Sequence, residues 1–268
     1  MSDELTDGVW WLSGTRGCNV YLVRADDGSF VLIDAAFASS AEAIVREMRP
    51  IVGDASITHV LLTHGHFDHV GSASRVAIAV GARIAAGAAD CERVDGSWVL
   101  RRQEPRRLPA VRDLLNRVRG VGDQSATEID DPLTGSVEVV PGIDAVPVPG
   151  HTAGGYCYLA RKADICFVGD LVIGHSDGLA RSLASANLDD ELYQDEMLKF
   201  SRSAADLGCP GHGYPSRGFP AALERLAREP RESWTFQNAP RRLRRLIAFA
   251  GYLALKRRSR ARDPSPPR

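Results

Sequence analysis

Four potential metal ligands or bases lie within six residues of one another, directly after an apolar stretch of the chain. The stretch, residues 57–62, is rich in β-branched and apolar residues and predicts a buried strand. The polar cluster that follows reads Thr63-His64-Gly65-His66-Phe67-Asp68-His69. Three imidazoles and a carboxylate are costly to bury together unless water or cations satisfy them. Cations explain this density best, so the sequence predicts a metal site at the end of the strand.

The remaining histidines support this interpretation, because five of the seven in the chain fall into three glycine-containing segments. The second segment is Pro149-Gly150-His151-Thr152 and the third is Gly211-His212-Gly213. Imidazole and carboxylate ligands suit zinc, iron or manganese. The five cysteines are scattered and never in CxxC spacing, which argues against a disulfide framework and against a thiolate zinc site.

Length and composition favour one large domain with a tail, since 268 residues with 44% hydrophobic content can bury a substantial core. A net charge of −1 gives no global sign of nucleic-acid binding, and no nucleic-acid partner is expected. The partner expected from the site chemistry given below is a small-molecule substrate. The acidic start at Met1-Ser2-Asp3-Glu4 is not followed by an apolar signal region, and no apolar run approaches the length of a membrane span. A cytoplasmic location is the expectation.

Alternating strands and helices predict an α/β fold whose strand-end loops carry the chemistry. In the first half we expect strands at 9–12, 19–23, 30–33, 57–62 and 82–85. We expect helices at 41–48 and 71–80, and Pro50 should end the first of these helices. In the second half we expect strands at 137–140, 143–148, 156–159 and 165–168, the last ending at Gly169-Asp170, a helix at 192–207 and a glycine-rich loop at 209–213.

Two segments resist a single interpretation. Residues 88–135 are arginine-rich, with apolar residues between 108 and 118 spaced for an amphipathic helix. This segment is interpreted as a solvated helix face over the site, as an anion-binding lid, or as a nucleic-acid surface, in that order. Residues 241–268 hold ten Lys or Arg and one acid, and their apolar centre predicts a helix packed on the domain or on a partner subunit. A weak interaction of 241–258 with a membrane surface is the alternative, and the chain end from Asp263 should be disordered.

The ordered motifs resemble the metallo-β-lactamase superfamily, including its glyoxalase II-like branch. The resemblance rests on His64-x-His66-x-Asp68-His69, the two later histidine segments, Gly169-Asp170, and Asp34 at the end of an apolar strand. It implies a four-layer αββα sandwich with the metal site at the edge of the two β-sheets. Residues 1–220 would form this domain, and 221–268 a helical, basic extension.

The resemblance also implies two divalent metal ions and seven ligands. Zn²⁺ is the first choice of metal, with iron or manganese as alternatives. The ligands would be His64, His66 and His151 for the first ion, Asp68, His69 and His212 for the second, and Asp170 bridging both. Asp34 would accept a hydrogen bond from a ligand or its backbone, although capping of the strand end is an alternative role.

The expected chemistry is hydrolysis by a metal-bridged hydroxide that attacks a carbonyl of an ester-type bond, with Asp68 orienting the hydroxide or carrying its proton. A thioester is the preferred substrate and a lactone is the next candidate. The lactone interpretation considers Tyr193 as a substrate-facing tyrosine of the kind that lactonases of the family carry. A β-lactam is disfavoured because Asp170 stands where some β-lactamases have cysteine. A mononuclear-iron oxidoreductase resembling persulfide dioxygenases is the alternative activity, and a non-catalytic interaction protein is the third.

Overall fold

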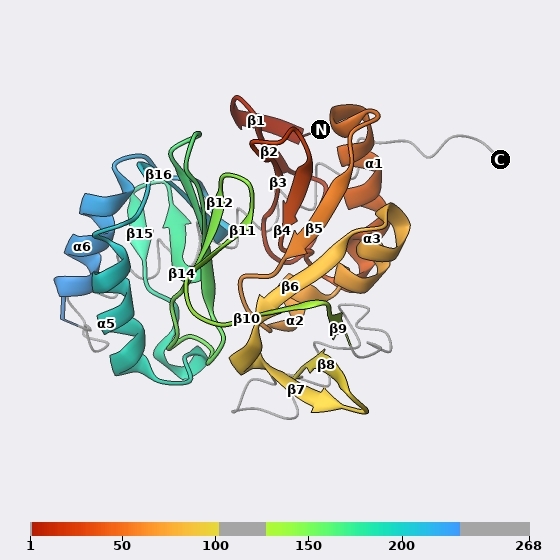
Figure 1. Cartoon of the computed structure of the whole chain (residues 1–268). Coiled ribbons are helices and arrows are strands. Elements are labelled where there is room, and N and C mark those ends of the chain that lie inside the picture. The colour runs from red at the N-terminus through yellow and green to blue at the C-terminus, as the bar shows by residue number, and fades with distance from the viewer. Residues whose placement is uncertain (1, 102–126, 231–268) are drawn as a thin grey trace.

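A computed structural model describes residues 2–101 and 127–230 of the chain (Figure 1). The expected amphipathic helix near 108–118 and the basic tail at 241–268 lie outside these residues. Within them, two β-sheets lie face to face and helices cover the two outer surfaces (Figure 1). None of the helices in the described ranges is long and apolar enough to cross a membrane.

The first sheet has seven strands in the order β1-β2-β3-β4-β5-β6-β10. Its strands are β1 (Ser2–Thr6), β2 (Val9–Leu12), β3 (Val20–Arg24), β4 (Phe30–Ile33), β5 (Ile57–Leu61), β6 (Arg83–Gly87) and β10 (Asp131–Leu133). Strands β1 to β4 form an antiparallel meander, whereas β4, β5, β6 and β10 run parallel. The carboxyl ends of β4 and β5 therefore meet at one edge, which brings Asp34 beside the polar cluster after β5.

The second sheet has six strands, with β15 and β16 both pairing with β14. Its strands are β11 (Val137–Val140), β12 (Ile143–Pro147), β13 (Tyr156–Ala160), β14 (Ile165–His175), β15 (Gly178–Ala180) and β16 (Leu207–Gly213). A small third sheet consists of β7 (Cys91–Val94), β8 (Ser97–Leu100) and β9 (Glu128–Ile129). The helices are α1 (Ala41–Val52), α2 (Phe67–Val70), α3 (Ala73–Val80), α5 (Asp190–Phe200) and α6 (Phe219–Arg228), with 3₁₀ turns η1 (Ala38–Ser40), η2 (Ala88–Asp90) and η3 (Ala184–Ala186).

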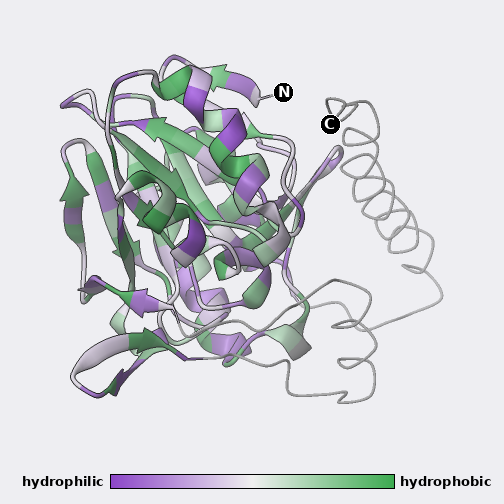
Figure 2. Cartoon of the chain, turned by 90° about the vertical axis from the view of Figure 1, so that its right-hand side faces the viewer, coloured by the Kyte–Doolittle hydropathy of each residue, from purple (hydrophilic) through white to green (hydrophobic). Residues whose placement is uncertain are grey.

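Three buried apolar clusters correspond to the three interfaces of a four-layer sandwich. One lies between the first sheet and α1 with α3, and includes Leu32 and Ile44. A second, with Tyr21 and Phe167, fills the space between the two sheets, and the third packs α5 and α6 onto the second sheet. In Figure 2, which looks onto the side of α1 and α3, hydrophilic and hydrophobic residues alternate along the helices, as expected for helices with one buried face. The predicted αββα sandwich is confirmed.

Several predicted element boundaries were wrong. Helix α1 continues through Pro50 to Val52, because proline has a helix-compatible φ and near the end of a helix it removes only one hydrogen bond. Helix α5 covers Asp190–Phe200 and stops well before residue 207. Strand β14 does not end at Gly169-Asp170 but runs on to His175, and the expected glycine-rich loop at 209–213 belongs to β16. Sheet β7-β8-β9 was not predicted within 88–135.

Candidate metal centre

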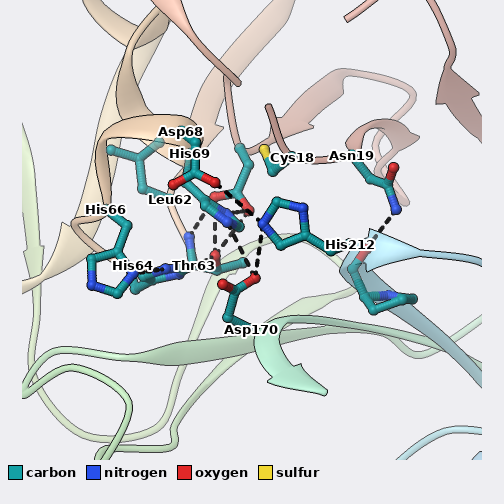
Figure 3. A network of polar contacts seen from close by, with 12 residues as sticks. Cys18, Asn19, Leu62, Thr63, His64, His66, Asp68, His69, Asp170 and His212 are labelled. Carbon is teal, nitrogen blue, oxygen red and sulfur yellow. Dashed lines mark hydrogen bonds and ion pairs between the residues drawn. The ribbon is translucent and has the colours of Figure 1, made fainter. Parts of the chain in front are cut away.

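Four segments that are distant in the sequence converge at one edge of the two sheets. Figure 3 shows the side chains from the segment after β5, from β14 and from β16. The segment after β5 supplies the cluster at 64–69, and the turn between β12 and β13 supplies His151. Strand β14 supplies Asp170 and β16 supplies His212. All seven side chains that the sequence singled out as possible ligands lie in this region, in two groups that adjoin each other.

The first group consists of His64, His66, His151 and Asp170, whose potential ligand atoms all lie within 4.8 Å of one another. His64 Nε2 is 2.9 Å from His66 Nδ1, and His151 Nε2 is 3.1 Å from the same atom. Asp170 Oδ2 lies 3.6 Å from His151 Nε2. Three ring nitrogens and a carboxylate oxygen thus face a common point, which is the arrangement that a metal ion requires.

The second group consists of Asp68, His69 and His212. His212 Nε2 lies 3.3 Å from Asp68 Oδ2 and 3.5 Å from Asp170 Oδ1. His69 Nε2 lies 3.2 Å from the same Asp170 oxygen. Asp170 therefore presents Oδ2 to the first group and Oδ1 to the second, so one carboxylate joins the two groups.

Burial and mutual repulsion keep the first group in a state that can bind a cation. Burial and then the neighbouring His151 lower the pKa of His66 to about 4. Burial, followed by the other histidines, also holds the pKa of His64 well below its ordinary value. Both rings are therefore neutral near pH 7 and have a lone pair available.

The two carboxylates are held ionised by the imidazoles around them. Burial alone would raise the pKa of Asp68, but the hydrogen bond from His212 and the charge of His69 lower that pKa to about 2. Burial likewise opposes ionisation of Asp170, yet His212 and His69 hold its pKa well below the ordinary value. The site is thus rich in negative charge and in neutral imidazole nitrogens.

His69 is different from the other imidazoles. Burial disfavours its charged form, but the neighbouring Cys18, Asp34 and Asp170 outweigh burial and hold its pKa well above the ordinary value. Its Nε2 atom and Asp170 Oδ1 are both buried and lie 3.2 Å apart as an ion pair, but among the residues that the structure describes neither has a partner in hydrogen-bond geometry. A buried polar atom without a partner is costly. A divalent cation between these atoms would satisfy both, so the residues present fit the metal ions that the sequence predicts.

Asp34 contacts the second group through His69, on the ring nitrogen that does not face Asp170. Its Oδ2 accepts a hydrogen bond from His69 Nδ1 at 2.8 Å, and Oδ1 accepts one from the Thr63 backbone N–H at 2.8 Å. Its side chain is 2% exposed and its backbone φ is 60°, a conformation that Asp tolerates better than most residues. Asp34 therefore fixes both the ring orientation of His69 and the start of the ligand segment.

Sequence reasoning missed two further polar residues of the site. Asn187 Oδ1 lies 2.7 Å from His151 Nδ1, and its amide nitrogen donates to Asp190 Oδ1 at 2.6 Å. Asp90 is buried and accepts hydrogen bonds from Gly65 and Thr152, which lie in the two segments that carry His64, His66 and His151. Asp90 carried one usable signal, because it is an acid that closely follows a strand end, as Asp34 does, whereas Asn187 carried none.

Tyr193 does not face the site. Its side chain is fully buried under the second sheet. The hydroxyl donates to Leu171 O at 2.6 Å and accepts from the Ser182 N–H at 3.1 Å. The suggestion that Tyr193 contacts a substrate was wrong, because its hydroxyl is already used to tie α5 to the sheet.

Comparison with known proteins agrees with this geometry. The family model described as "Metallo-beta-lactamase superfamily" matches residues 13–212. The chain therefore belongs to the metallo-beta-lactamase superfamily, which makes it a member of a superfamily of metallo-hydrolases.

Among curated relatives, Thioesterase pkgB of Emericella nidulans is 27% identical over 219 residues, covering 80% of this chain and 52% of the relative. Hydroxyacylglutathione hydrolase of Cereibacter sphaeroides is 28% identical over 199 residues, covering 71% of this chain and 64% of the relative. The chain thus spans between half and two thirds of the length of these two relatives.

Solved structures share the fold at low sequence identity. The BLEG-1 B3 metallo-beta-lactamase is 20% identical with a TM-score of 0.60, covering 81% of this chain and 99% of that chain. TTHA1623 in a di-iron-bound form is 23% identical with a TM-score of 0.56, covering 79% of this chain and 92% of that chain. These similarities support the αββα architecture.

Proposed function

We propose that this protein is a dinuclear metal-dependent hydrolase that cleaves a thioester. The observation that carries the proposal is the sharing of Asp170 between two adjoining ligand groups, with one oxygen toward each. His64, His66 and His151 would hold one divalent ion, and Asp68, His69 and His212 the other. Zinc is the metal we favour, because imidazole and carboxylate ligands suit it, and iron is the alternative.

When bound, a pair of divalent ions supplies a water of lowered pKa and polarises a carbonyl oxygen. The protein's own contribution is orientation. Asp68 is ionised and lies 3.3 Å from His212, so its oxygen atoms can accept a hydrogen bond at the junction of the two groups. A pKa of about 2 keeps Asp68 ionised, so that it accepts hydrogen bonds but is a weak base, and we therefore assign it mainly an orienting role.

Two observations favour a thioester over a lactone. The relatives named above carry the names thioesterase and hydroxyacylglutathione hydrolase, and the latter name describes a thioester substrate. The residue that favoured a lactone in the sequence was Tyr193, and its hydroxyl is occupied by the backbone of Leu171 and Ser182.

The test is metal stoichiometry of the full-length protein purified without added metal, combined with turnover of a panel of small thioesters and lactones. Two zinc equivalents with thioester hydrolysis would support the proposal. About one iron per chain, with oxygen uptake on a persulfide, would replace it by the oxidoreductase alternative.

Variants test the ligand assignment. Asp170→Ala and His66→Ala should each abolish turnover and lower the bound metal, because each removes a ligand. His59→Ala is the matched control, since His59 lies on β5 and pairs with Asp131 outside the site. Full turnover with two bound ions in either ligand variant would contradict the dinuclear assignment.

A further inference from the structure

Asp90 is a buried carboxylate that contacts the two segments that carry the imidazoles of the first ligand group. It ends η2, just after β6, and is 1% exposed. Its Oδ2 accepts hydrogen bonds from the Gly65 N–H at 3.0 Å and from Thr152 Oγ1 at 2.7 Å. Its Oδ1 accepts one from the Gly154 N–H at 2.7 Å. Three donors therefore converge on one side chain.

The positions of these donors give Asp90 its importance. Gly65 lies between His64 and His66, and Thr152 directly follows His151. The first segment extends from the first sheet, and the second precedes β13 of the second sheet. One carboxylate therefore fixes the separation of the three imidazoles of the first group, although it contacts none of them in the described hydrogen-bond network.

The backbone around Asp90 is itself held in place. Arg101 donates its backbone N–H to Asp90 O at 2.8 Å and its Nη2 to Ala89 O at 2.9 Å. A Cβ on Gly154 would lie 2.5 Å from Asp90 N, and a Cβ on Gly87 would lie 2.1 Å from Gly154 O. The two segments pack so closely that only glycine fits at both positions.

We propose that Asp90 is a positioning residue for the first metal ion, as Asp34, described above, is for the second. The proposal rests on the dinuclear site proposed above. Asp34 holds one ligand ring directly, through His69, whereas Asp90 holds the backbone that carries the ligands. Loss of Asp90 should therefore weaken one ion selectively and leave the other in place.

Asp90→Asn is the sharpest perturbation because it keeps the size of the side chain. An amide presents one oxygen and one NH₂ group. Whichever way it is oriented, the NH₂ group must face either the Gly65 N–H or the Gly154 N–H. One donor then points at another, and the two segments must separate. Removing such a supporting partner commonly lowers metal affinity by about 10- to 100-fold.

The experiment measures zinc affinity of metal-free full-length protein by competition with a chromophoric chelator, in two backgrounds that each keep one ligand group. His212→Ala retains the first group and His66→Ala retains the second. Asp90→Asn should weaken zinc binding by about 10- to 100-fold in the first background and by less than about twofold in the second. An equal loss in both backgrounds, or no loss in the first, would overturn the proposal.

Two further variants keep the result interpretable. Asp130→Asn is the matched control, because Asp130 also accepts a backbone N–H, that of Ile84, but away from the site. It should leave zinc affinity unchanged in both backgrounds. Thr152→Val keeps its shape and removes a single hydrogen bond to Asp90, so even if Asp90→Asn fails to fold it should still weaken zinc selectively in the first background, by about 2- to 10-fold. Wild-type zinc affinity in Thr152→Val would refute the role of Asp90.

The proposed function can fail separately. A wild-type protein that binds zinc with the selective response above but does not hydrolyse thioesters would retain the role of Asp90 and reject the substrate. A wild-type protein with no zinc affinity would overturn both proposals.

Discussion

Replacing Asp34 with asparagine isolates what the carboxylate does for the second metal. Asparagine has nearly the same shape, and it tolerates the φ of 60° observed at this position. The Thr63 hydroxyl donates to the carboxylate, at 2.8 Å from Oδ2 and 3.1 Å from Oδ1. Two nitrogen donors also use different oxygens of the carboxylate, the Thr63 N–H to Oδ1 and His69 Nδ1 to Oδ2, each at 2.8 Å. An amide has a single oxygen, so one of these two hydrogen bonds must be lost.

The asparagine amide has two possible orientations, and each removes a different hydrogen bond. If the amide oxygen stays on Thr63, its NH₂ group faces His69 Nδ1, and the ring must carry its proton on Nε2, the atom that faces Asp170. A protonated nitrogen has no lone pair for a metal. If the amide turns over, its NH₂ group faces the Thr63 backbone N–H, so that two donors face each other. Losing a hydrogen bond to a charged group costs about 1.5–3 kcal/mol, which corresponds to roughly 10- to 150-fold in zinc affinity.

The assay is a zinc titration of metal-free protein against a chromophoric chelator, in the His66→Ala background that keeps only the second ligand group. Asp164→Asn is the matched control, since Asp164 also has a positive φ, of 52°, and accepts the Asp206 N–H. The control should bind zinc as the parent does. If Asp34→Asn also binds zinc with unchanged affinity, the tautomer argument is refuted.

Three other outcomes follow from the structure. Tyr193→Phe should lower the free energy of unfolding by about 1–3 kcal/mol in a urea titration, because it removes the hydroxyl's two hydrogen bonds with the buried backbone of Leu171 and Ser182. The kcat should stay within about twofold, and a large loss of kcat would restore a catalytic role. Burial lowers the pKa of His59 below 6.5, so the unfolded chain takes up this proton first as the pH falls, and stability is lost from about pH 6.5 downward. The melting temperature of His59→Asn should therefore fall less than that of the wild type between pH 7.5 and 5.5, and an equal fall would contradict the assignment. Chelation should lower the melting temperature and zinc should restore it, by an amount equivalent to about 2.7 kcal/mol at a free zinc concentration 100 times the Kd; a melting temperature independent of zinc would argue against a metal site.

The ligand residues could be predicted from the sequence because their signal is local. An apolar strand followed by His64, His66, Asp68 and His69 has few physical explanations, and the fold brings exactly such strand ends together at a sheet edge. His212 was singled out because it lies between two glycines, whereas Asp170 was assigned as a ligand only through the resemblance to the metallo-β-lactamase superfamily. The density of histidines predicted a metal site, and the resemblance supplied the full ligand set.

The secondary structure around Asp170 and His212 could not be predicted, because the glycines there are required by the close packing of the site and not by a loop. Gly211 lies in a strand, and a Cβ there would lie 2.5 Å from His69 Cε1 and 2.8 Å from Asp170 Oδ1. Gly169 has a φ of 48°, and the pairing of β14 with β16 shifts register on both sides of it. Glycine is uncommon in strands, so sequence reasoning expected a loop where close approach to the site requires glycine.

The supporting hydrogen bonds could not be predicted for a different reason. Asp90 is 25 residues from Gly65 and 62 from Thr152, and Asn187 is 36 residues from His151. Asp and Asn are common at turns, where they usually bond to their own neighbours. Only the packing of the two sheets decides which of them face a ligand.

This dependence on sheet packing extends to the metal ions themselves. The first ligand group combines His64 and His66 from the side of the first sheet with His151 from the second, and the second group combines His69 with His212 in the same way. Neither half of the chain holds a complete set. A metal ion bound at this edge therefore adds its binding free energy to the association of the two sheets. For the same reason Asp34 and Asp90, which are buried behind the two groups, can control metal affinity without contacting a metal.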